Sequence, residues 1–82
     1  MARGPAGRPL ELAMDASGIG NGVRCRVEVV TASGESAWNG ASNPEGGKLL
    51  ARVPQGLRSG SYWVRLYAPG DELVREFGLR LD

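Results

Sequence analysis

The 82-residue sequence contains no histidine, and its single cysteine, Cys25, has no second thiol to pair with. Without imidazole the chain cannot build a Ser-His or Cys-His nucleophile pair, and one thiolate cannot hold a zinc ion. An internal disulfide is excluded as well, so stability must come from packing or from a neighbouring subunit. Cys25 alternates with Val23, Val27 and Val29, a pattern in which a thiol acts as a small apolar side chain. We therefore interpret Cys25 as part of the core.

An excess of charge of one sign is also missing, because the formal net charge is only +1. Proteins that bind nucleic acids or anionic membranes usually carry a basic stripe or patch, and the sequence contains none. We therefore expect no nucleic-acid partner. No stretch approaches the roughly 20 apolar residues that cross a bilayer, so we expect a soluble chain without direct membrane insertion.

The carboxylates do not form a convincing catalytic pair. Asp71 and Glu72 fall in a predicted turn and Glu76 in the strand after it. Carboxylates in turns are normally solvated, and a domain of this size offers little room for a substrate cleft. We predict no catalytic residues and no enzymatic activity.

The glycine-rich segment and its neighbours do not predict a cofactor or metal site either. Gly18, Gly20 and Gly22 are followed by no helix that could offer its N-terminus to a phosphate. Asp15 and Asn21 lack the alternating acidic ligands of a calcium loop. We therefore expect a flexible connection here, with no cofactor and no metal ion.

The clearest pattern in the sequence is an alternation of apolar and polar side chains with period two, most regular from residue 57 to residue 81. One predicted strand places Tyr62, Val64 and Leu66 on one face and Trp63, Arg65 and Tyr67 on the other. A turn at Pro69-Gly70-Asp71 follows. The returning strand then places Leu73, Arg75, Phe77, Leu79 and Leu81 on one face. This pattern predicts a β-hairpin.

Four more short strands are expected upstream, at residues 10–15, 23–32, a short segment ending at Trp38, and 48–53. Residues 39–47 are predicted to form a long turn or a crossing between sheets. With the hairpin this gives six strands and no helical periodicity, which indicates a small all-β antiparallel sandwich. We expect residues 1–9 to be a flexible lead-in and residues 10–82 to be a single β-sandwich domain.

Leu57, Gly60 and Tyr62, in the spacing Leu-x-x-Gly-x-Tyr before an alternating strand, resemble the corner that opens the sixth strand of fibronectin type III and related immunoglobulin-like domains. The resemblance implies a sandwich of about six to seven strands. It also implies that the Tyr62 hydroxyl binds a backbone group a few residues upstream.

The chain is also similar to C-terminal β-sandwich domains of certain bacterial anti-sigma-factor-like signalling proteins. This similarity is carried by the strand Arg26–Val30, the Gly turn before Trp38 and the final Glu76–Arg80 strand. It implies a sensing or accessory domain without chemistry of its own, within a larger membrane-anchored or cytoplasmic signalling protein. The sequence lacks the zinc-binding and membrane-spanning parts of those proteins.

The solvent side of one predicted sheet collects arginines and aromatics. With the usual pairing order it holds Arg24, Arg26, Glu28, Trp63, Arg65, Tyr67, Glu76 and Arg80. Because aromatics beside arginines mark binding hot spots, Trp63, Arg65, Tyr67, Arg24 and Arg26 are the candidate binding residues. The alternative is a solvated surface of cross-strand Arg-Glu pairs that Trp63 merely covers. Trp38 is expected in the core or at its rim.

We expect a noncatalytic interaction module that binds protein through this face or through an edge strand. With six strands one sheet edge is unpaired, which predicts a homodimer or a strand-swapped dimer. The alternative function is carbohydrate binding, in which exposed Trp63 and Trp38 would stack on sugar rings.

Overall fold

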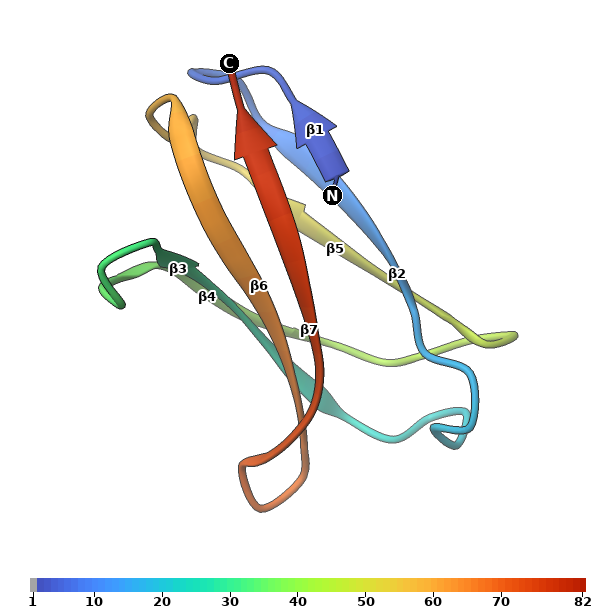
Figure 1. The fold of residues 1–82 in the computed structure, drawn as a ribbon. Helices are drawn as coiled ribbons and strands as arrows, with labels where there is room; N and C mark the ends of the chain where they lie inside the picture. The colour runs from blue at the N-terminus through green and yellow to red at the C-terminus, as the bar shows by residue number, and fades with distance from the viewer. Residues whose placement is uncertain (1) are drawn as a thin grey trace.

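The computed structural model describes residues 2–82, which form seven β-strands and no α-helix. The strands are β1 (Ala2–Gly4), β2 (Leu10–Asp15), β3 (Cys25–Thr31), β4 (Ser36–Ser42), β5 (Lys48–Val53), β6 (Gly60–Ala68) and β7 (Glu72–Leu81). They form one sheet in the order β1-β7-β6-β3-β4 and a second sheet of β2 and β5 (Figure 1). The all-β prediction is confirmed. Within residues 2–82 there is no helix suited to spanning a membrane.

The predicted β6–β7 hairpin is confirmed, together with its division into two faces. Tyr62, Val64 and Leu66 are buried, whereas Trp63 between them is exposed. The turn is closed by the Asp71 N–H, which donates to the Ala68 carbonyl at 3.1 Å. Gly70 follows Pro69 and has a φ of 86°, the positive value found at the third position of a type II turn.

A β-bulge in β7 changes the face of one predicted residue. Leu66 lies opposite Arg75, but Tyr67 lies opposite Leu73, so Val74 is an extra residue in the ladder. Leu73 is therefore displaced to the opposite face and is 49% exposed. The prediction that Leu73 shares a face with Arg75 and Phe77 is wrong, because strict alternation does not allow for the inserted residue.

The bounds of β2 and β5 agree with the predicted strands, but the segment between β4 and β5 differs from the prediction. Residues 39–42 extend β4 and are not part of a turn. Gly40 fits in this strand because the ring of Trp38 lies over it, in the space that a Cβ would occupy. The actual turn is at Gly46 and Gly47, both with positive φ, between reciprocal backbone hydrogen bonds of Glu45 and Lys48.

The segment predicted as a flexible lead-in contributes a strand, so the count of six strands is corrected to seven. β1 runs parallel to β7, and the Asp82 N–H donates to the Gly4 carbonyl at 3.1 Å. Gly7 N–H also donates to the Leu57 carbonyl at 2.8 Å. This strand forms through backbone contacts, so a Gly- and Pro-rich sequence gives no alternation by which to predict it. Met1 lies outside the described residues.

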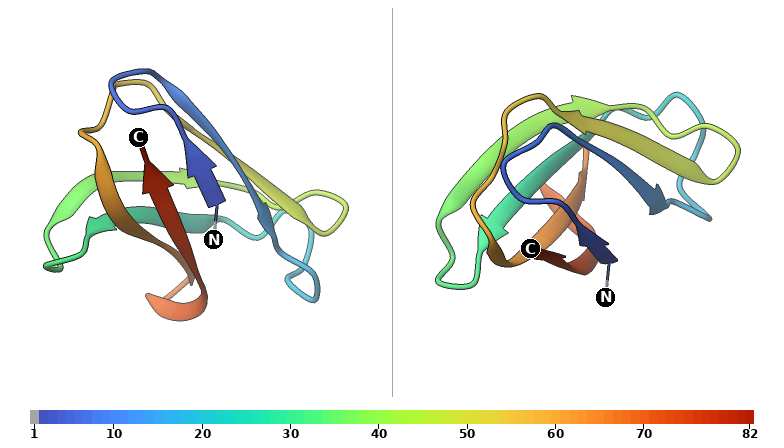
Figure 2. Two further views of the ribbon diagram at one scale, coloured as in Figure 1. Left: turned by 45° about the horizontal axis from the view of Figure 1, so that its top comes forward. Right: turned by 90° about the horizontal axis from the view of Figure 1, so that it is seen from above.

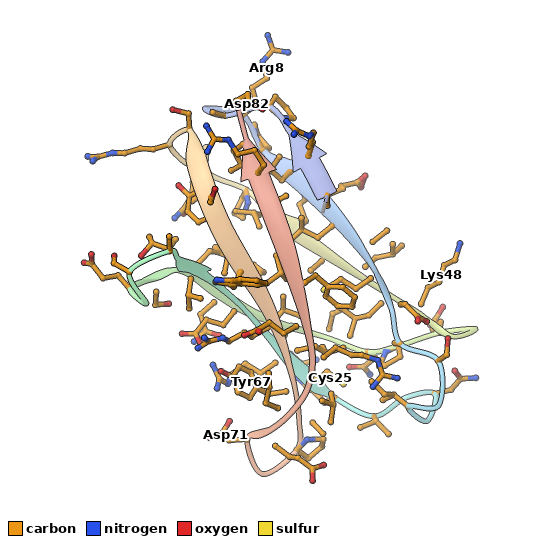
Figure 3. The ribbon with its side chains drawn as sticks, in the orientation of Figure 1. Arg8, Cys25, Lys48, Tyr67, Asp71 and Asp82 are labelled. Carbon is orange, nitrogen blue, oxygen red and sulfur yellow. The ribbon has the colours of Figure 1, made fainter. Side chains whose placement is uncertain are left out.

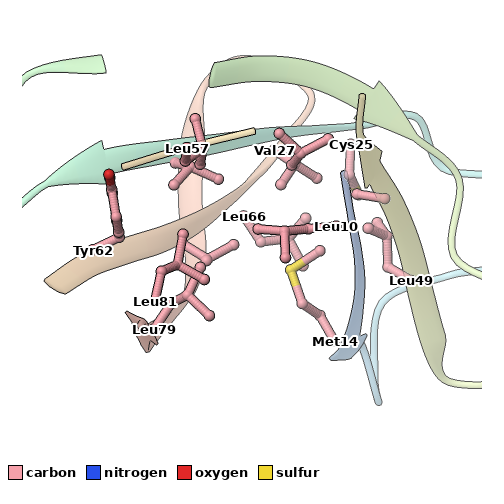
Figure 4. Packing of buried hydrophobic residues seen from close by; sticks show 14 of the residues in the cluster. Leu10, Met14, Cys25, Val27, Leu49, Leu57, Tyr62, Leu66, Leu79 and Leu81 are labelled. Carbon is pink, nitrogen blue, oxygen red and sulfur yellow. The ribbon is translucent and has the colours of Figure 1, made fainter. Parts of the chain in front are cut away.

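Figure 2 shows how the strands of the two sheets are arranged. The core lies between the sheets and contains side chains from both of them (Figure 4). Its buried members are Leu10, Met14, Ala16, Cys25, Val27, Val29, Leu49, Ala51, Val53, Leu57, Tyr62, Val64, Leu66, Leu79 and Leu81. No charged side chain is buried in the part of the chain that the structure describes. Hydrophobic burial therefore holds the sheets together without a buried ion pair.

The predicted tyrosine corner is present at the start of β6. The ring of Tyr62 is only 8% exposed, and its hydroxyl donates to the Arg58 carbonyl at 2.8 Å. Leu57 is buried beside it, and Gly60 has a φ of 147° that disfavours a side chain. The corner fixes the loop from β5 to the point at which β6 begins.

Tyr62→Phe is expected to lower the free energy of unfolding by about 1 kcal/mol, because the Arg58 carbonyl loses its donor. Urea denaturation measures the change. The matched control is Tyr67→Phe, which removes a hydroxyl from the exposed face and should alter stability by less than about 0.5 kcal/mol. Equal losses in both variants would contradict the role of the corner.

Candidate functional site

The candidate site is the surface of the five-stranded sheet that points away from the core, which we call the outer face. Strand register builds it from cross-strand pairs: Arg26 opposite Tyr67, Glu28 opposite Arg65, Val30 opposite Trp63, Arg65 opposite Glu76 and Ser61 opposite Arg80. The register thus brings together the predicted residues of β3, β6 and β7.

Arg26 is held at one end of the outer face by three partners. Its guanidinium carbon lies 4.1 Å from the ring centroid of Tyr67, a cation–π contact. Its Nε donates to Asp71 Oδ1 at 3.2 Å, and Nη1 lies 3.8 Å from Glu28. Figure 3 shows Tyr67 and Asp71 at the same end of the β6–β7 hairpin. These contacts hold Arg26 over the ring of Tyr67.

Arg65 occupies the middle of the outer face. Its Nε donates to Glu76 Oε2 at 2.9 Å, and this hydrogen bond is the main reason that the pKa of Arg65 is raised. Both side chains are more than a third exposed, so the pair adds little to stability. The pair therefore orients Arg65 without burying its charge.

Trp63 is a large apolar side chain of the outer face, as is the displaced Leu73 opposite Tyr67. Its side chain is 43% exposed, yet Val30 directly opposite on β3 is only 2% exposed although it points away from the core. Cross-strand neighbours on one face are in contact range, so the indole helps to cover Val30. An exposed aromatic side chain opposite a buried aliphatic one, with Arg65 nearby, has the composition of a binding hot spot.

Two other predicted residues lie away from this centre. Arg24 precedes β3 and lies with Arg26 and Asp71 around a shallow hollow of about 320 Å³ at the β6–β7 turn. Trp38 is half-buried on the inner face of β4 and packs against the core, which confirms the core-or-rim prediction. The outer face therefore presents one exposed indole, that of Trp63.

Cys25 is buried and borders the core. Burial raises the pKa of its thiol, and the sulfur lies 3.6 Å from the Val23 carbonyl. Because the thiolate is the reactive form, the raised pKa makes this side chain a poor nucleophile. The core interpretation of Cys25 is confirmed.

Asp15, considered as a calcium ligand, instead ends β2. It accepts hydrogen bonds from the hydroxyl and the backbone N–H of Ser17, which lower the pKa of its carboxyl. Arg75 Nη2 donates to the Ser17 carbonyl at 2.6 Å and ties the same loop to β7. Residues 2–82 contain no cluster of acidic or thiol side chains that could hold a metal ion.

Two features of the structure are not predicted by any sequence pattern. Alternation from Val27 and Val29 places Val30 on the outer face, but only the register places it opposite Trp63, and it is buried there. A cavity of about 270 Å³ also opens between β1 and β2, above Val64, Phe77 and Leu79. Its position depends on β1, which has no sequence signal.

Comparison with known proteins identifies no relative: no protein-family model, no curated protein and no solved structure matches the chain.

Native Cys25 is expected to react slowly with iodoacetamide at pH 8, because a buried thiol of raised pKa forms little thiolate and is poorly accessible. Mass spectrometry of the intact protein measures the rate, and unfolding in urea should increase it by roughly a hundredfold or more. Rapid labelling of the native protein would contradict the core assignment.

Proposed function

We propose that this chain is a noncatalytic protein-interaction module that binds through the outer face or an edge strand, and that its partners include a second copy of itself. The observation that carries the proposal is the exposed Trp63 over buried Val30, beside oriented arginines. Aromatic and arginine side chains supply much of the binding energy at protein interfaces.

We propose further that the fold is an immunoglobulin-like sandwich of the fibronectin type III kind. The order β7-β6-β3-β4, with β2-β5 in the other sheet, corresponds to strands G-F-C-C′ and B-E of such domains. The Tyr62 corner at the start of β6 supports the same assignment. The role of an accessory domain in a signalling protein belongs to this proposal and rests on the sequence pattern.

The noncatalytic part of the proposal is supported by the available nucleophiles and bases. The sequence has no histidine, and the only thiol is buried with a raised pKa. The carboxylate of Glu76 is engaged by Arg65, and that of Asp71 by Arg26. No base is therefore positioned to activate a nucleophile on the outer face.

Carbohydrate binding is the second candidate, and the exposed indole of Trp63 favours it because aromatic faces stack on sugar rings. Trp38 cannot complete a platform with Trp63, since it lies half-buried on the inner face. A sugar site would therefore have to rely on one exposed indole, which makes protein the better-supported ligand.

A glycan array tests the choice between these functions. We expect no binding from the wild-type chain or from Trp63→Ala, because the outer face presents a single indole. Sugar binding that is lost in Trp63→Ala and retained in Leu50→Ala would overturn the protein-interaction proposal. Leu50 is a suitable control because it is 66% exposed and lies on the other sheet.

Protein binding is tested with the same variants immobilised and exposed to an extract of the source cells. We expect Trp63→Ala to reduce capture of a specific protein roughly tenfold or more, as hot-spot truncation does, with little change in unfolding temperature. Leu50→Ala should capture it as the wild type does. Equal capture by all three proteins would contradict the role of the outer face.

A further inference from the structure

β4 is an edge strand of unusual composition. It is the last strand of its sheet, with no strand hydrogen-bonded beyond it in that sheet among residues 2–82. β5 of the other sheet lies close to β4 (Figure 2), and the Ser42 hydroxyl on β4 donates to the Leu50 carbonyl on β5. The sequence of β4, Ser36-Ala37-Trp38-Asn39-Gly40-Ala41-Ser42, contains no charged residue and no proline. Natural sheets usually protect such edges with charges, proline or very short strands. A bulge beside Ala37 interrupts only one end of β4.

The other edges are better protected. β1 is only three residues long and carries Arg3. β2 carries Glu11 and Asp15, and β5 carries Lys48 and Arg52. The Leu50 carbonyl on β5 also accepts a hydrogen bond from the Ser42 hydroxyl at 2.7 Å. β4 is therefore the edge at which no charged side chain of the strand itself opposes the addition of another strand.

The direction of the backbone groups along β4 follows from one hydrogen bond. The Thr31 N–H donates to the Glu35 carbonyl at 2.8 Å, so Thr31 points its backbone groups toward β4. Because these groups alternate along a strand, Val29 and Val27 also point toward β4, at Trp38 and Gly40. The N–H and C=O groups of Asn39 and Ala41 therefore point to the free edge.

The sequence of β4 is nearly palindromic about Asn39. In an antiparallel pair of two such strands centred there, serine meets serine, alanine meets alanine and asparagine meets asparagine. The one exception pairs Trp38 with Gly40 of the second copy; because each Trp38 ring lies over Gly40 of its own chain, the two indoles would lie next to each other on the inner face of the joined sheet. A shift by two residues would lose the serine, alanine and asparagine matches.

We propose that two copies of the chain associate by antiparallel pairing of β4 with β4, centred on Asn39. This inference rests on the proposed interaction function and specifies the edge that self-association uses. The Asn39 backbone groups of the two copies exchange hydrogen bonds, and those of Ala41 meet the backbone near Ala37 of the second copy. The two five-stranded sheets become one, with both outer faces on the same side and free to bind.

Edge prolines test the pairing. Ala41→Pro removes an N–H that points to the free edge and is not used by the β3–β4 ladder. We expect the wild type to dimerise between micromolar and millimolar concentration in analytical ultracentrifugation, and Ala41→Pro to raise the dissociation constant roughly tenfold or more. The matched control is Ala13→Pro on β2. The Ala16 N–H donates to the Gly47 carbonyl, so by alternation the Ala13 N–H points away from β5, and this variant should dimerise normally.

Asn39→Lys provides a second variant in case Ala41→Pro fails to fold. Glu28 lies opposite Asn39 on β3, so lysine gains a partner within the monomer. Across the two-fold axis, however, it faces the lysine of the other copy. We expect weaker dimerisation that high salt partly restores. Gln55→Lys, at an exposed position in the loop after β5, is the charge-matched control and should dimerise as the wild type does.

Disulfide formation tests the register. In Asn39→Cys the two new thiols lie opposite each other with Cα atoms about 5.5 Å apart, within the range that a disulfide spans. We expect rapid dimer cross-linking on mild oxidation. Ser36→Cys is the control, because the two copies of position 36 would lie roughly 20 Å apart. Equal cross-linking of both variants would overturn the register.

The outcomes separate this proposal from the proposed function. A wild-type chain that stays monomeric to millimolar concentration, or an Ala41→Pro variant that dimerises normally, overturns β4 pairing and leaves binding through the outer face intact. Dimerisation lost in Trp63→Ala but kept in Ala41→Pro assigns self-association to the outer face and also overturns the edge proposal. If β4 dimers form but Trp63→Ala captures partner protein normally, only the role of the outer face fails.

Discussion

The structure depends on β6, whose side chains alternate between the core and the outer face while its backbone pairs with β3 and β7. Tyr62, Val64 and Leu66 bury one side against the second sheet. Trp63 and Arg65 are thereby fixed on the other side, because neighbouring side chains in a strand must point in opposite directions. The core and the outer face are therefore two consequences of one strand's register.

The Tyr62 corner keeps this register in place. Its hydroxyl ties the start of β6 to the Arg58 carbonyl, so a slip by one residue would break this bond and also expose the buried row. The lead-in reinforces the same region, since Gly7 binds the Leu57 carbonyl and β1 covers β7. An 82-residue chain has a small core, so these backbone contacts matter more than they would in a larger domain.

β1 occupies one edge of the five-stranded sheet, so β4 at the other edge is where the proposed strand addition would take place. The outer face and the β4 edge are perpendicular surfaces of the same sheet. The proposed partner on the outer face and the proposed second copy at the edge would therefore not compete for the same surface. Edge pairing would place two outer faces side by side, and a bivalent surface binds a repeated partner more tightly without any new contact.

The sequence by itself determined the all-β class, the bounds of β2 and β5, the two faces of β6 and the Tyr62 corner, because these follow from local alternation and spacing. Only the tertiary structure decided that residues 2–4 form β1 and that Leu73 changes face. It also decided that Val30 lies opposite Trp63 and that β4 has no second neighbour in its sheet. Such features depend on which strands meet and in what register, and contacts between residues distant along the chain leave no periodic signal in it.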